Sequence, residues 1–288
     1  MKKTLLFFAF LTVSLGSGAD VTDGLKCQMD FTNVEGKNVT DPRSGITAKI
    51  MNTATVEEMG SYRVLNLGGS GTGYLDLTAA TGELFAGMAN YTVSVYYRVK
   101  ENTSLSGNGH FLWAFSTSTA CTSSAGVYTA YRLNAQRFAS STGGYSNEKG
   151  YSVGTASETG RWIHVAVTQT GTTGRLYIDG VLKGAITGMA TNATLYGTAK
   201  PQYCWVGRPH FSGDSYLKNT LVADLRLYDR ALTLTQVKEL AAETALLDDA
   251  YIHGTPGDAT QLSATIDEAR QLTAALQVAA RKDGGSPD

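Results

Sequence analysis

The sequence contains little proline and carries almost no net charge. Only 5 of its 288 residues are proline, against 32 glycines, so its turns depend mainly on glycine. Lysine and arginine number 24 and aspartate and glutamate 25, which gives a formal net charge of −1 at pH 7. This balance provides no basic field for nucleic acid or for an anionic membrane surface, so we expect neither as a partner.

Long apolar runs are also missing beyond the N-terminus. There, two lysines precede an apolar run from Thr4 to Leu15, and small residues follow up to Ala19. This order is typical of a secretory signal peptide cleaved after Ala19. No other stretch approaches the roughly 20 apolar residues that a membrane helix needs. The sequence therefore predicts a leader at 1–19 and export to the medium, the periplasm or the cell surface, without membrane insertion.

Cysteine is scarce, with three residues in the chain: Cys27, Cys121 and Cys204. Export places them in an oxidising compartment, where one disulfide and one free thiol can form. Cys121 and Cys204 both lie in or beside polar loop segments, so we predict that these two pair. The two pairings that use Cys27 stay open. None of the three has the spacing of a metal-binding finger.

Short runs of alternating apolar and polar residues fill the chain from about Leu25 to Tyr228. In YTVSVYYRVK, residues 91–100, the odd-numbered residues form an apolar face and the even-numbered residues a polar face that we expect to meet water. About twelve such strands favour an all-β fold, two antiparallel sheets stacked as a jelly-roll sandwich. The strands are predicted near 25–31, 46–50, 62–67, 73–77, 91–99, 111–116, 127–133, 136–139, 162–168, 174–178, 204–206 and 221–228.

After Tyr228 the pattern changes to helical spacing. Thr233 and Gln236 form a capping box, in which each side chain satisfies a free backbone N–H at the start of a helix. We predict one helix from there to about Tyr251 and a second over about 259–281. Residues 242–288 are therefore expected to form a helical hairpin with a frayed tail. Its apolar stripe can pack back on the sandwich, pair with a second copy, or present a surface to a partner, and the sequence leaves these three roles open.

The stretch GRWIHVAVTQTGTTGRLYIDG, residues 160–180, carries the most specific motif. Its W-I-H-V-A-V-T and L-Y-I-D-G parts resemble a signature of laminin G-like domains in the concanavalin A-like lectin/glucanase superfamily. Further pieces of the chain resemble the same family in the same order: FTNVEGKNVTDPRSG at 31–45, GYLDL at 73–77, YTVS at 91–94 and LRLYDRAL at 225–232. The resemblance spans 25–241 and implies a concanavalin A-like jelly roll over residues 20–241.

Within this motif, Trp162, His164 and Asp179 are either a site or part of how the sheet is built. The odd-numbered residues 163–167 alternate with the even-numbered ones, as in a strand with one core face. We interpret all three residues as structural. His164 is expected to be hydrogen-bonded inside or beside the sheet, and Asp179 with Gly180 to form a hairpin turn.

The acidic residues do not follow the pattern of a glucanase. Glucanases of this superfamily carry acids along one strand face, typically as E-x-D-x-x-E, because hydrolysis needs a proton donor and a nucleophile about 5–5.5 Å apart. The sequence contains no such triplet and no nucleophile elbow. We therefore expect a non-catalytic module. The nearest acidic clusters are Glu57-Glu58, Asp248-Asp249 and the pair Asp224 and Asp229.

Candidate saccharide-binding residues lie on two strands. Aromatic rings that stack on sugars and polar groups that select hydroxyls are the usual parts of such a site. If both strands belong to one concave sheet, their outward residues line a groove; the alternative is a solvated face with ordinary cross-strand contacts. The candidates are Tyr96, Arg98, Tyr128, Arg132 and Asn134.

Two other sets of residues have weaker patterns. His210 and Asp214, in the loop RPHFSGDSY, form a second candidate rim, whereas Trp113 and Trp205 lie in apolar runs and are expected in the core. The family resemblance implies calcium as a recurrent ion, held by side-chain and backbone oxygens. Its candidate ligands are Asp41 and Asp224, each of which also fits a turn or capping role.

Together these patterns predict a secreted glycan-binding or adhesion module whose partner is a carbohydrate or an extracellular protein. A protein–protein scaffold domain is the first alternative, and a polysaccharide hydrolase of the glucanase type is the second.

Overall fold

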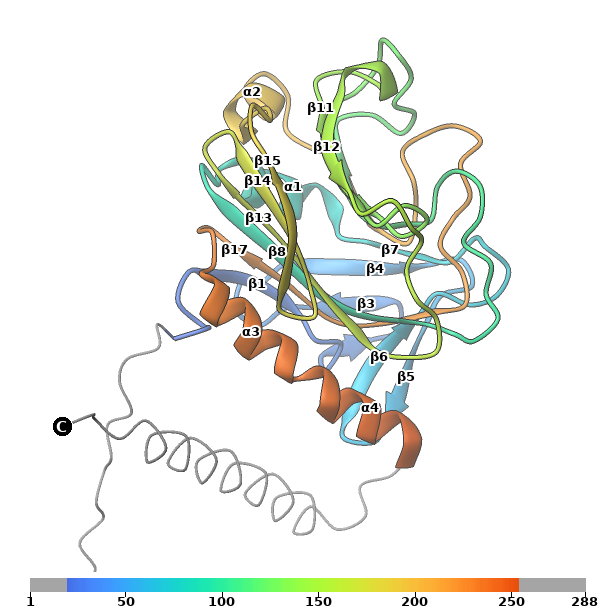
Figure 1. Ribbon diagram of the computed structural model, residues 1–288. Helices are drawn as coiled ribbons and strands as arrows, with labels where there is room; N and C mark the ends of the chain where they lie inside the picture. Colours follow the sequence, from blue (N-terminus) through green and yellow to red (C-terminus); the bar gives the residue numbers. More distant parts are fainter. Residues whose placement is uncertain (1–19, 254–288) are drawn as a thin grey trace, which may run out of the picture.

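The computed structural model describes residues 20–253, in which two antiparallel β-sheets stack into a sandwich (Figure 1). The predicted all-β, two-sheet architecture is therefore confirmed. The predicted leader at 1–19 and the predicted second helix at 259–281 lie outside the described residues. Within 20–253, no helix is long and apolar enough to cross a membrane.

One sheet has eight strands and the other has nine. The eight-stranded sheet contains β1 (Leu25–Met29), β5 (Thr55–Met59), β6 (Tyr62–Asn66), β8 (Tyr91–Val99), β13 (Ile163–Thr170), β14 (Thr173–Ile178), β15 (Val181–Ile186) and β17 (Thr220–Tyr228). The nine-stranded sheet contains β2 (Val34–Glu35), β3 (Asn38–Thr40), β4 (Thr47–Met51), β7 (Tyr74–Asp76), β9 (Phe111–Ser116), β10 (Tyr128–Arg132), β11 (Arg137–Ser141), β12 (Glu148–Ser152) and β16 (Tyr203–Val206). β8 and β17 are neighbours in the centre of the first sheet, so the site described below is built on central strands.

The main core lies between the sheets, because alternate residues of most strands are apolar. On β8 the predicted apolar face, residues 91, 93, 95, 97 and 99, belongs entirely to this core. Trp113 is fully buried in it, as predicted. Trp205 is also buried, but it lies on the other side of its strand from the core residues Cys204 and Val206.

The motif at 160–180 builds β13, β14 and the turn after them. Its odd-numbered residues 163–167 lie in the core, and the Nε2 atom of the fully buried His164 is 2.8 Å from the Ser94 hydroxyl. Asp179 has a φ of 49° in the two-residue turn before β15, and its carboxylate accepts the His164 backbone N–H at 2.9 Å. The expected hydrogen bond of His164 inside the sheet is confirmed.

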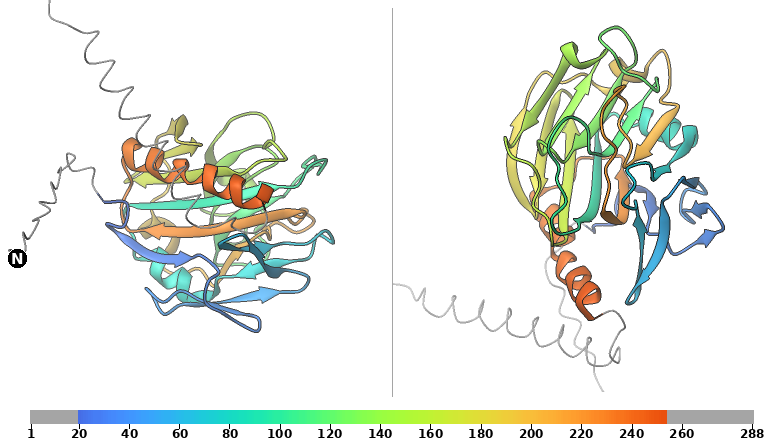
Figure 2. Two further views of the ribbon diagram at one scale, coloured as in Figure 1. Left: turned by 90° about the horizontal axis from the view of Figure 1, so that it is seen from below. Right: turned by 90° about the vertical axis from the view of Figure 1, so that its right-hand side faces the viewer.

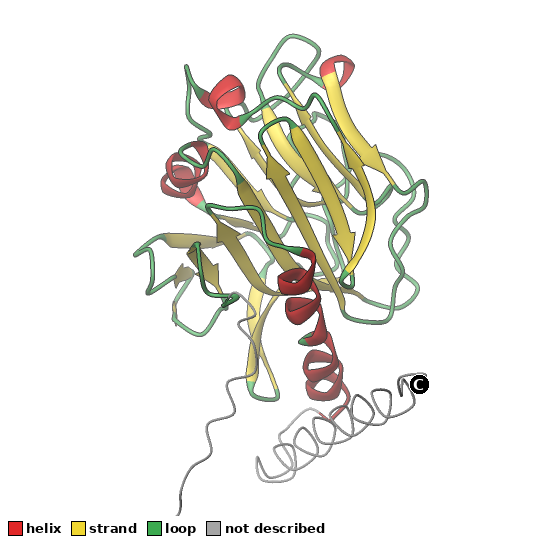
Figure 3. Cartoon of the chain, turned by 60° about the vertical axis from the view of Figure 1, so that its left-hand side comes forward, coloured by secondary structure: helices red, strands yellow, loops and turns green. Residues whose placement is uncertain are grey.

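Two helices at the end of the described chain cover the outer face of the eight-stranded sheet (Figures 2 and 3). They are α3 (Leu234–Ala242) and α4 (Thr244–His253). Val237 and Leu240 of α3 are fully buried against this sheet, and Leu247 of α4 packs in a cluster with Trp162. The expectation that the second face of β8 meets water is wrong, because residues 92, 94, 96 and 98 lie buried on this face.

The predicted single helix from Thr233 to about Tyr251 is two helices that meet at Glu243. The capping box is confirmed, since Thr233 and Gln236 bond each other's backbone N–H groups. Glu243 closes α3, and the Thr244 hydroxyl donates to the carbonyl of Ala241 at 2.8 Å. α3 therefore ends before Glu243, and α4 begins at the residue after it. Two further helices, α1 (Thr78–Ala86) and α2 (Asn192–Tyr196), and a 3₁₀ turn at Tyr145–Asn147 were not predicted.

The strands that the sequence does not predict are β2, β3, β5, β12 and β15. All of them lie at or near the sheet edges, and their side chains are mostly exposed or half-buried. An edge strand has few apolar residues to bury, so it lacks the period-two pattern that marks the central strands.

The predicted Cys121–Cys204 disulfide is not formed, and all three cysteines are free and buried. Cys204 belongs to the core between the sheets, whereas Cys121 packs with Phe111 and Tyr128 on the outer face of the nine-stranded sheet. A disulfide cannot join side chains on opposite faces of one sheet without moving the backbone.

Removing the cap of α3 is expected to destabilise the protein modestly. Thr233→Ala deletes the hydroxyl that accepts the Gln236 N–H at 3.3 Å, so the free energy of unfolding should fall by about 1 kcal/mol. Urea unfolding followed by tryptophan fluorescence measures the change. Thr233→Ser keeps the hydroxyl and is the matched control. An equal loss in both variants would contradict the capping role.

Candidate binding pocket

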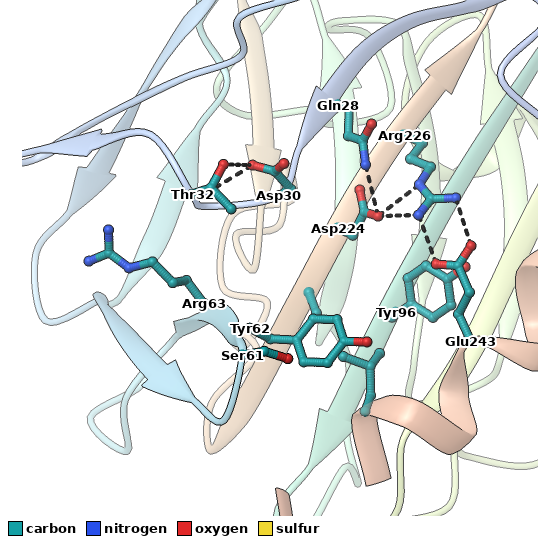
Figure 4. Close-up of a pocket in the computed structure, with 12 residues that line it drawn as sticks. Gln28, Asp30, Thr32, Ser61, Tyr62, Arg63, Tyr96, Asp224, Arg226 and Glu243 are labelled. Carbon is teal, nitrogen blue, oxygen red and sulfur yellow. Dashed lines mark hydrogen bonds and ion pairs between the residues drawn. The ribbon is translucent and has the colours of Figure 1, made fainter. Parts of the chain in front are cut away.

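A cavity of about 310 Å³ opens where β1, β6, β8 and β17 meet α3 and α4 (Figure 4). It lies on the outer face of the eight-stranded sheet, so it is separate from the core between the sheets. Polar and aromatic side chains from segments far apart in the sequence make up its wall. The lining residues are Gln28, Asp30, Thr32, Ser61, Tyr62, Arg63, Tyr96, Ala223, Asp224, Arg226, Glu243 and Leu247.

A β-bulge in β17 directs Asp224 into this cavity. Ala223 pairs with Tyr96 of β8 and Arg226 pairs with Ser94, so β17 has one residue more than β8 between these two pairs. Asp224 occupies the bulge with a φ of 53°. Bulges turn a side chain out of the normal alternation and are frequent beside functional sites.

Arg226 binds two carboxylates of the cavity at once. Its Nε donates to Asp224 Oδ2 at 2.8 Å, and its Nη2 forms a short contact with the same oxygen. The guanidinium also donates to both carboxylate oxygens of Glu243, at 3.2 and 2.8 Å. Gln28 completes the group by donating to Asp224 Oδ2 at 3.0 Å. Asp224 and Glu243 therefore lie close together, but both carboxylates are bound to the same Arg226 guanidinium.

The second oxygen of Asp224 is buried and has no hydrogen-bond partner among residues 20–253. Burial raises the pKa of Asp224, while the Arg226 guanidinium and the hydrogen bonds oppose this shift. A buried acceptor without a partner is unfavourable, so a donor that reached Oδ1 would be stabilised there. This atom is the clearest unsatisfied group of the pocket.

Tyr62 forms the aromatic wall. Its half-buried ring lies below Asp224 in Figure 4, and burial raises the pKa of its hydroxyl. Arg63, the next residue, forms no ion pair in the described part of the chain, and its Nε is buried without a partner. The cavity lining thus includes the Tyr62 ring, the Arg63 guanidinium without an ion-pair partner among the described residues, and the unpartnered acceptor Asp224 Oδ1.

The five predicted saccharide-binding residues do not share a groove. Tyr96 lies on β8 of one sheet and Tyr128 on β10 of the other, so the assumption that both strands belong to one sheet is wrong. Tyr96 does line the cavity, but it is only 1% exposed and its hydroxyl donates to the Leu240 carbonyl at 2.7 Å. Arg98 is buried beside it, with its guanidinium 3.9 Å from the centre of the Tyr251 ring.

The other three candidates are held in contacts around the nine-stranded sheet. Tyr128 and Arg132 both donate to the carboxylate of Glu148, Arg132 at 2.8 Å, and Arg137 donates to it at 2.9 Å. The Glu148 side chain is 3% exposed, so this is a buried ionic cluster that ties β10 to β11 and β12. Asn134 donates to the Gly107 carbonyl at 2.5 Å.

The second predicted rim is also only partly exposed. His210 is fully buried, stacks on Trp205 with ring centres 4.3 Å apart, and has its Nε2 2.9 Å from the Tyr203 carbonyl. It therefore lies under the loop rather than on a rim. Asp214 is half-buried, and burial raises the pKa of its carboxyl group.

Residues 68–238 match the Laminin_G_3 family model, which is described as the concanavalin A-like lectin/glucanases superfamily. The match covers more than half of the 288 residues. This chain belongs to that family. The resemblance found in the sequence is thereby confirmed. No curated protein matches the chain.

Solved structures with the same fold come from several kinds of protein. Domain 4 of the extracellular GH43 arabinanase AbnA from Geobacillus stearothermophilus, in complex with arabinotriose, has a TM-score of 0.56 and 18% identity over 75% of this chain and 98% of that one. A Trypanosoma rangeli sialidase in complex with sialic acid has a TM-score of 0.53 and 17% identity, over 78% of this chain and 33% of the sialidase. The binding domain of botulinum neurotoxin serotype D/C has a TM-score of 0.55 and 14% identity, over 78% of this chain and 53% of the toxin domain. At these identities the likeness shows the fold alone, and this laminin G-like chain spans about a third of the sialidase and about half of the toxin domain.

Neither aspartate predicted to bind calcium lies in a suitable ligand set. Asp41 is 2% exposed, and its carboxylate accepts the backbone N–H groups of Arg43 and Ser44, each at 3.0 Å, as in a turn cap. Asp224 is paired with Arg226. Residues 20–253 contain no group of three or more His, Cys, Asp or Glu side chains that could hold a metal ion. Calcium stays a prediction from family membership, without a site at these two positions.

Most of the pocket could not be found from the sequence. The sequence predicts Asp224 as a metal ligand and Tyr96 as a sugar contact, and the structure places both in the wall of the same cavity. Tyr62, Arg63 and Glu243 were missed because they come from an edge hairpin and from a helix end. The one available signal is that Asp224 and Arg226 stand two residues apart within the strand predicted at 221–228, as residues on one face of a strand do.

Proposed function

We propose that this chain is a secreted, non-catalytic module that binds a saccharide in the cavity around Tyr62 and Asp224. The observation that carries the proposal is the buried, unpartnered Oδ1 of Asp224 beside an aromatic wall. Saccharides present both hydroxyl donors and apolar C–H faces, which are the groups that this pair of features accepts.

The size and polarity of the cavity support a small ligand. Its volume is near the lower end of the range of about 300–1,000 Å³ for small-molecule pockets, which suits one or two sugar rings. Arg63, Asp30 and Thr32 add polar groups around the opening. The arabinanase domain solved with arabinotriose has the same fold, which supports a saccharide as the ligand class.

The pairing of acids in the cavity supports binding rather than hydrolysis. A glycosidase needs one carboxyl group that gives a proton and a second that attacks or activates water. Here Asp224 and Glu243 are both engaged by Arg226. The extracellular arabinanase neighbour and the predicted leader together support export as the location.

The proposal predicts that saccharide binding depends on the Tyr62 ring. In a glycan screen of the full chain, Tyr62→Ala should weaken binding of the best saccharide about tenfold, because the stacking surface is lost. Tyr62→Phe keeps the ring and should bind within about threefold of the parent. Tyr145→Ala removes a 69% exposed tyrosine from outside the pocket and should have no effect.

Three outcomes of this screen contradict the proposal. They are equal losses for Tyr62→Ala and Tyr145→Ala, hydrolysis of any polysaccharide by the chain, and binding of no saccharide at all. Running the screen with calcium and with a chelator tests the family-derived calcium prediction at the same time. Binding that survives the chelator is the expected result for a pocket built from a ring, a guanidinium and a carboxylate.

A protein partner is the second candidate, and one observation favours it. Val181 and Leu182 on the edge strand β15 are 54% and 46% exposed. An exposed apolar edge is a surface to which another chain can add a strand. Of the three roles left open for the apolar stripe of the C-terminal helices, α3 follows the first, packing on the sandwich, which leaves less support for pairing of copies through this helix.

A further inference from the structure

We propose that a second cavity, at one end of the sandwich, binds a sugar acid, that is, a polyhydroxylated ring that carries a carboxylate. The cavity has a volume of about 350 Å³ and shares no residue with the pocket around Tyr62. It is lined by residues of three loops, those between β6 and β7, between β8 and β9, and between β16 and β17. The proposal does not depend on the function proposed for the first pocket.

Two of the three loops, the one between β8 and β9 and the one between β16 and β17, are joined by backbone hydrogen bonds. The His110 N–H donates to the Ser215 carbonyl at 2.8 Å, and the Ser215 N–H donates to the Asn108 carbonyl at 3.1 Å. Gly109 lies between them with a φ of 104°, and a Cβ atom at that position would lie 2.3 Å from the Ser215 carbonyl oxygen. Only glycine fits there, so these two loops are ordered before a ligand arrives.

The charge of the cavity favours an anion. Lys218 lines it, and its ammonium group forms no ion pair with the described residues. No aspartate or glutamate is among the lining residues. A carboxylate bound here would therefore meet the Lys218 ammonium, which has no ion-pair partner among the described residues, while Asp214, which interacts electrostatically with His110, is not among the lining residues.

The remaining groups favour a ligand with hydroxyls. Four serines line the cavity, at positions 70, 104, 106 and 215. The Ser70 hydroxyl bonds those of Thr53 and Thr72, and the hydroxyls of Ser104 and Ser106 bond each other. Because a hydroxyl has one donor and two acceptor positions, each can still bond a ligand. The half-buried ring of Tyr216 provides a surface on which a sugar ring can stack.

His110 supplies an acceptor for a ligand hydroxyl. Its side chain is 3% exposed, and its Nε2 lies 3.1 Å from the carbonyl oxygen of Ser106. A carbonyl oxygen only accepts, so Nε2 carries a hydrogen, and in the tautomer with its hydrogen on Nε2 the other nitrogen, Nδ1, is an acceptor. Nδ1 is buried and has no partner among the described residues. A bare anion cannot satisfy this atom, but an anion that also bears hydroxyls can.

The test is a titration of the full chain with D-glucuronate, D-glucose and acetate, followed by NMR. Glucuronate should bind at least tenfold more tightly than glucose or acetate, because it alone offers both groups. Lys218→Gln should weaken glucuronate binding at least tenfold. Lys200→Gln, which changes an exposed lysine outside the cavity, should leave it unchanged.

The ¹⁵N signal of His110 Nδ1 reports the contact directly. On addition of glucuronate to the parent chain it should move in the direction of a nitrogen that accepts a hydrogen bond. Tyr62→Ala should leave the glucuronate affinity unchanged, which separates this site from the first. The proposal is overturned if glucose binds as tightly as glucuronate, if Lys218→Gln has no effect, or if the His110 signal does not move.

Discussion

Lowering the pH from 6.5 to 4.5 is expected to reduce the free energy of unfolding by about 2–3 kcal/mol for each of two buried histidines. His164 and His210 are both fully buried. Burial lowers the pKa of each from 6.5 to about 3, helped by Arg226 at His164 and by Arg208 at His210, where a hydrogen bond to the Tyr203 carbonyl partly opposes the shift. In the folded state both rings therefore stay neutral down to about pH 3.

The direction follows from where the protons bind. Below pH 6.5 the unfolded chain takes up protons on these histidines and the folded chain does not, so each step toward acid favours the unfolded state. The loss continues until the pH reaches the folded pKa of about 3. Asp214 and Asp224, whose pKa values are raised by burial, shift stability in the opposite direction in acid.

Histidine variants separate these contributions. Urea unfolding at pH 6.5, 5.5 and 4.5 gives the slope of stability against pH for the parent, for His164→Gln and for His210→Gln. Each variant should have a slope smaller by about 1.4 kcal/mol per pH unit at the acid end, whatever its stability at pH 6.5. Unchanged slopes would show that the two rings take up protons in the folded protein.

Replacing Arg226 with methionine is expected to lower the free energy of unfolding by about 3–5 kcal/mol. The Arg226 side chain is 11% exposed and joins Asp224 on β17 to Glu243 at the end of α3. Without it, a largely buried carboxylate loses its cation and the sheet loses its ionic link to the helix. Methionine fills much of the same space, so the loss should come from charge rather than from a cavity.

Arg63→Met is the matched control for this prediction. Arg63 lines the same cavity, but no described residue forms an ion pair with it, so its replacement should cost less than about 1 kcal/mol. Both variants are compared by urea unfolding at pH 7. If Arg226→Met costs no more than Arg63→Met, the ionic group does not hold the helices on the sandwich.

The central strands could be predicted from sequence because their pattern is local. The strands predicted at 91–99 and 111–116 have the same bounds as β8 and β9. Both are buried along their whole length, so their apolar residues mark the entire strand. The edge strands β5, β12 and β15 bury little, so the same physical rule gives no signal there. The start of helix α3 can be predicted because both residues of its capping box, Thr233 and Gln236, lie within four positions of each other in the sequence.

The candidate site was harder to predict because it depends on contacts between distant segments. The sequence places Tyr96 on the polar face of a strand, but only the fold shows that α3 lies over this face. Likewise, the bulge that turns Asp224 outward arises because β17 has one residue more than β8 between two paired positions. The sequence of either strand alone does not reveal this difference. The choice of Tyr128 failed for the same reason, since strand order decides which sheet it joins.

A crystal structure of the chain with the best saccharide from the screen tests the proposed pocket most directly. We expect an intact sugar that stacks on Tyr62 and donates a hydroxyl to Asp224 Oδ1. A sugar bound instead over Tyr128 and Arg132 on the nine-stranded sheet, or found cleaved beside Asp224 and Glu243, would contradict the proposal.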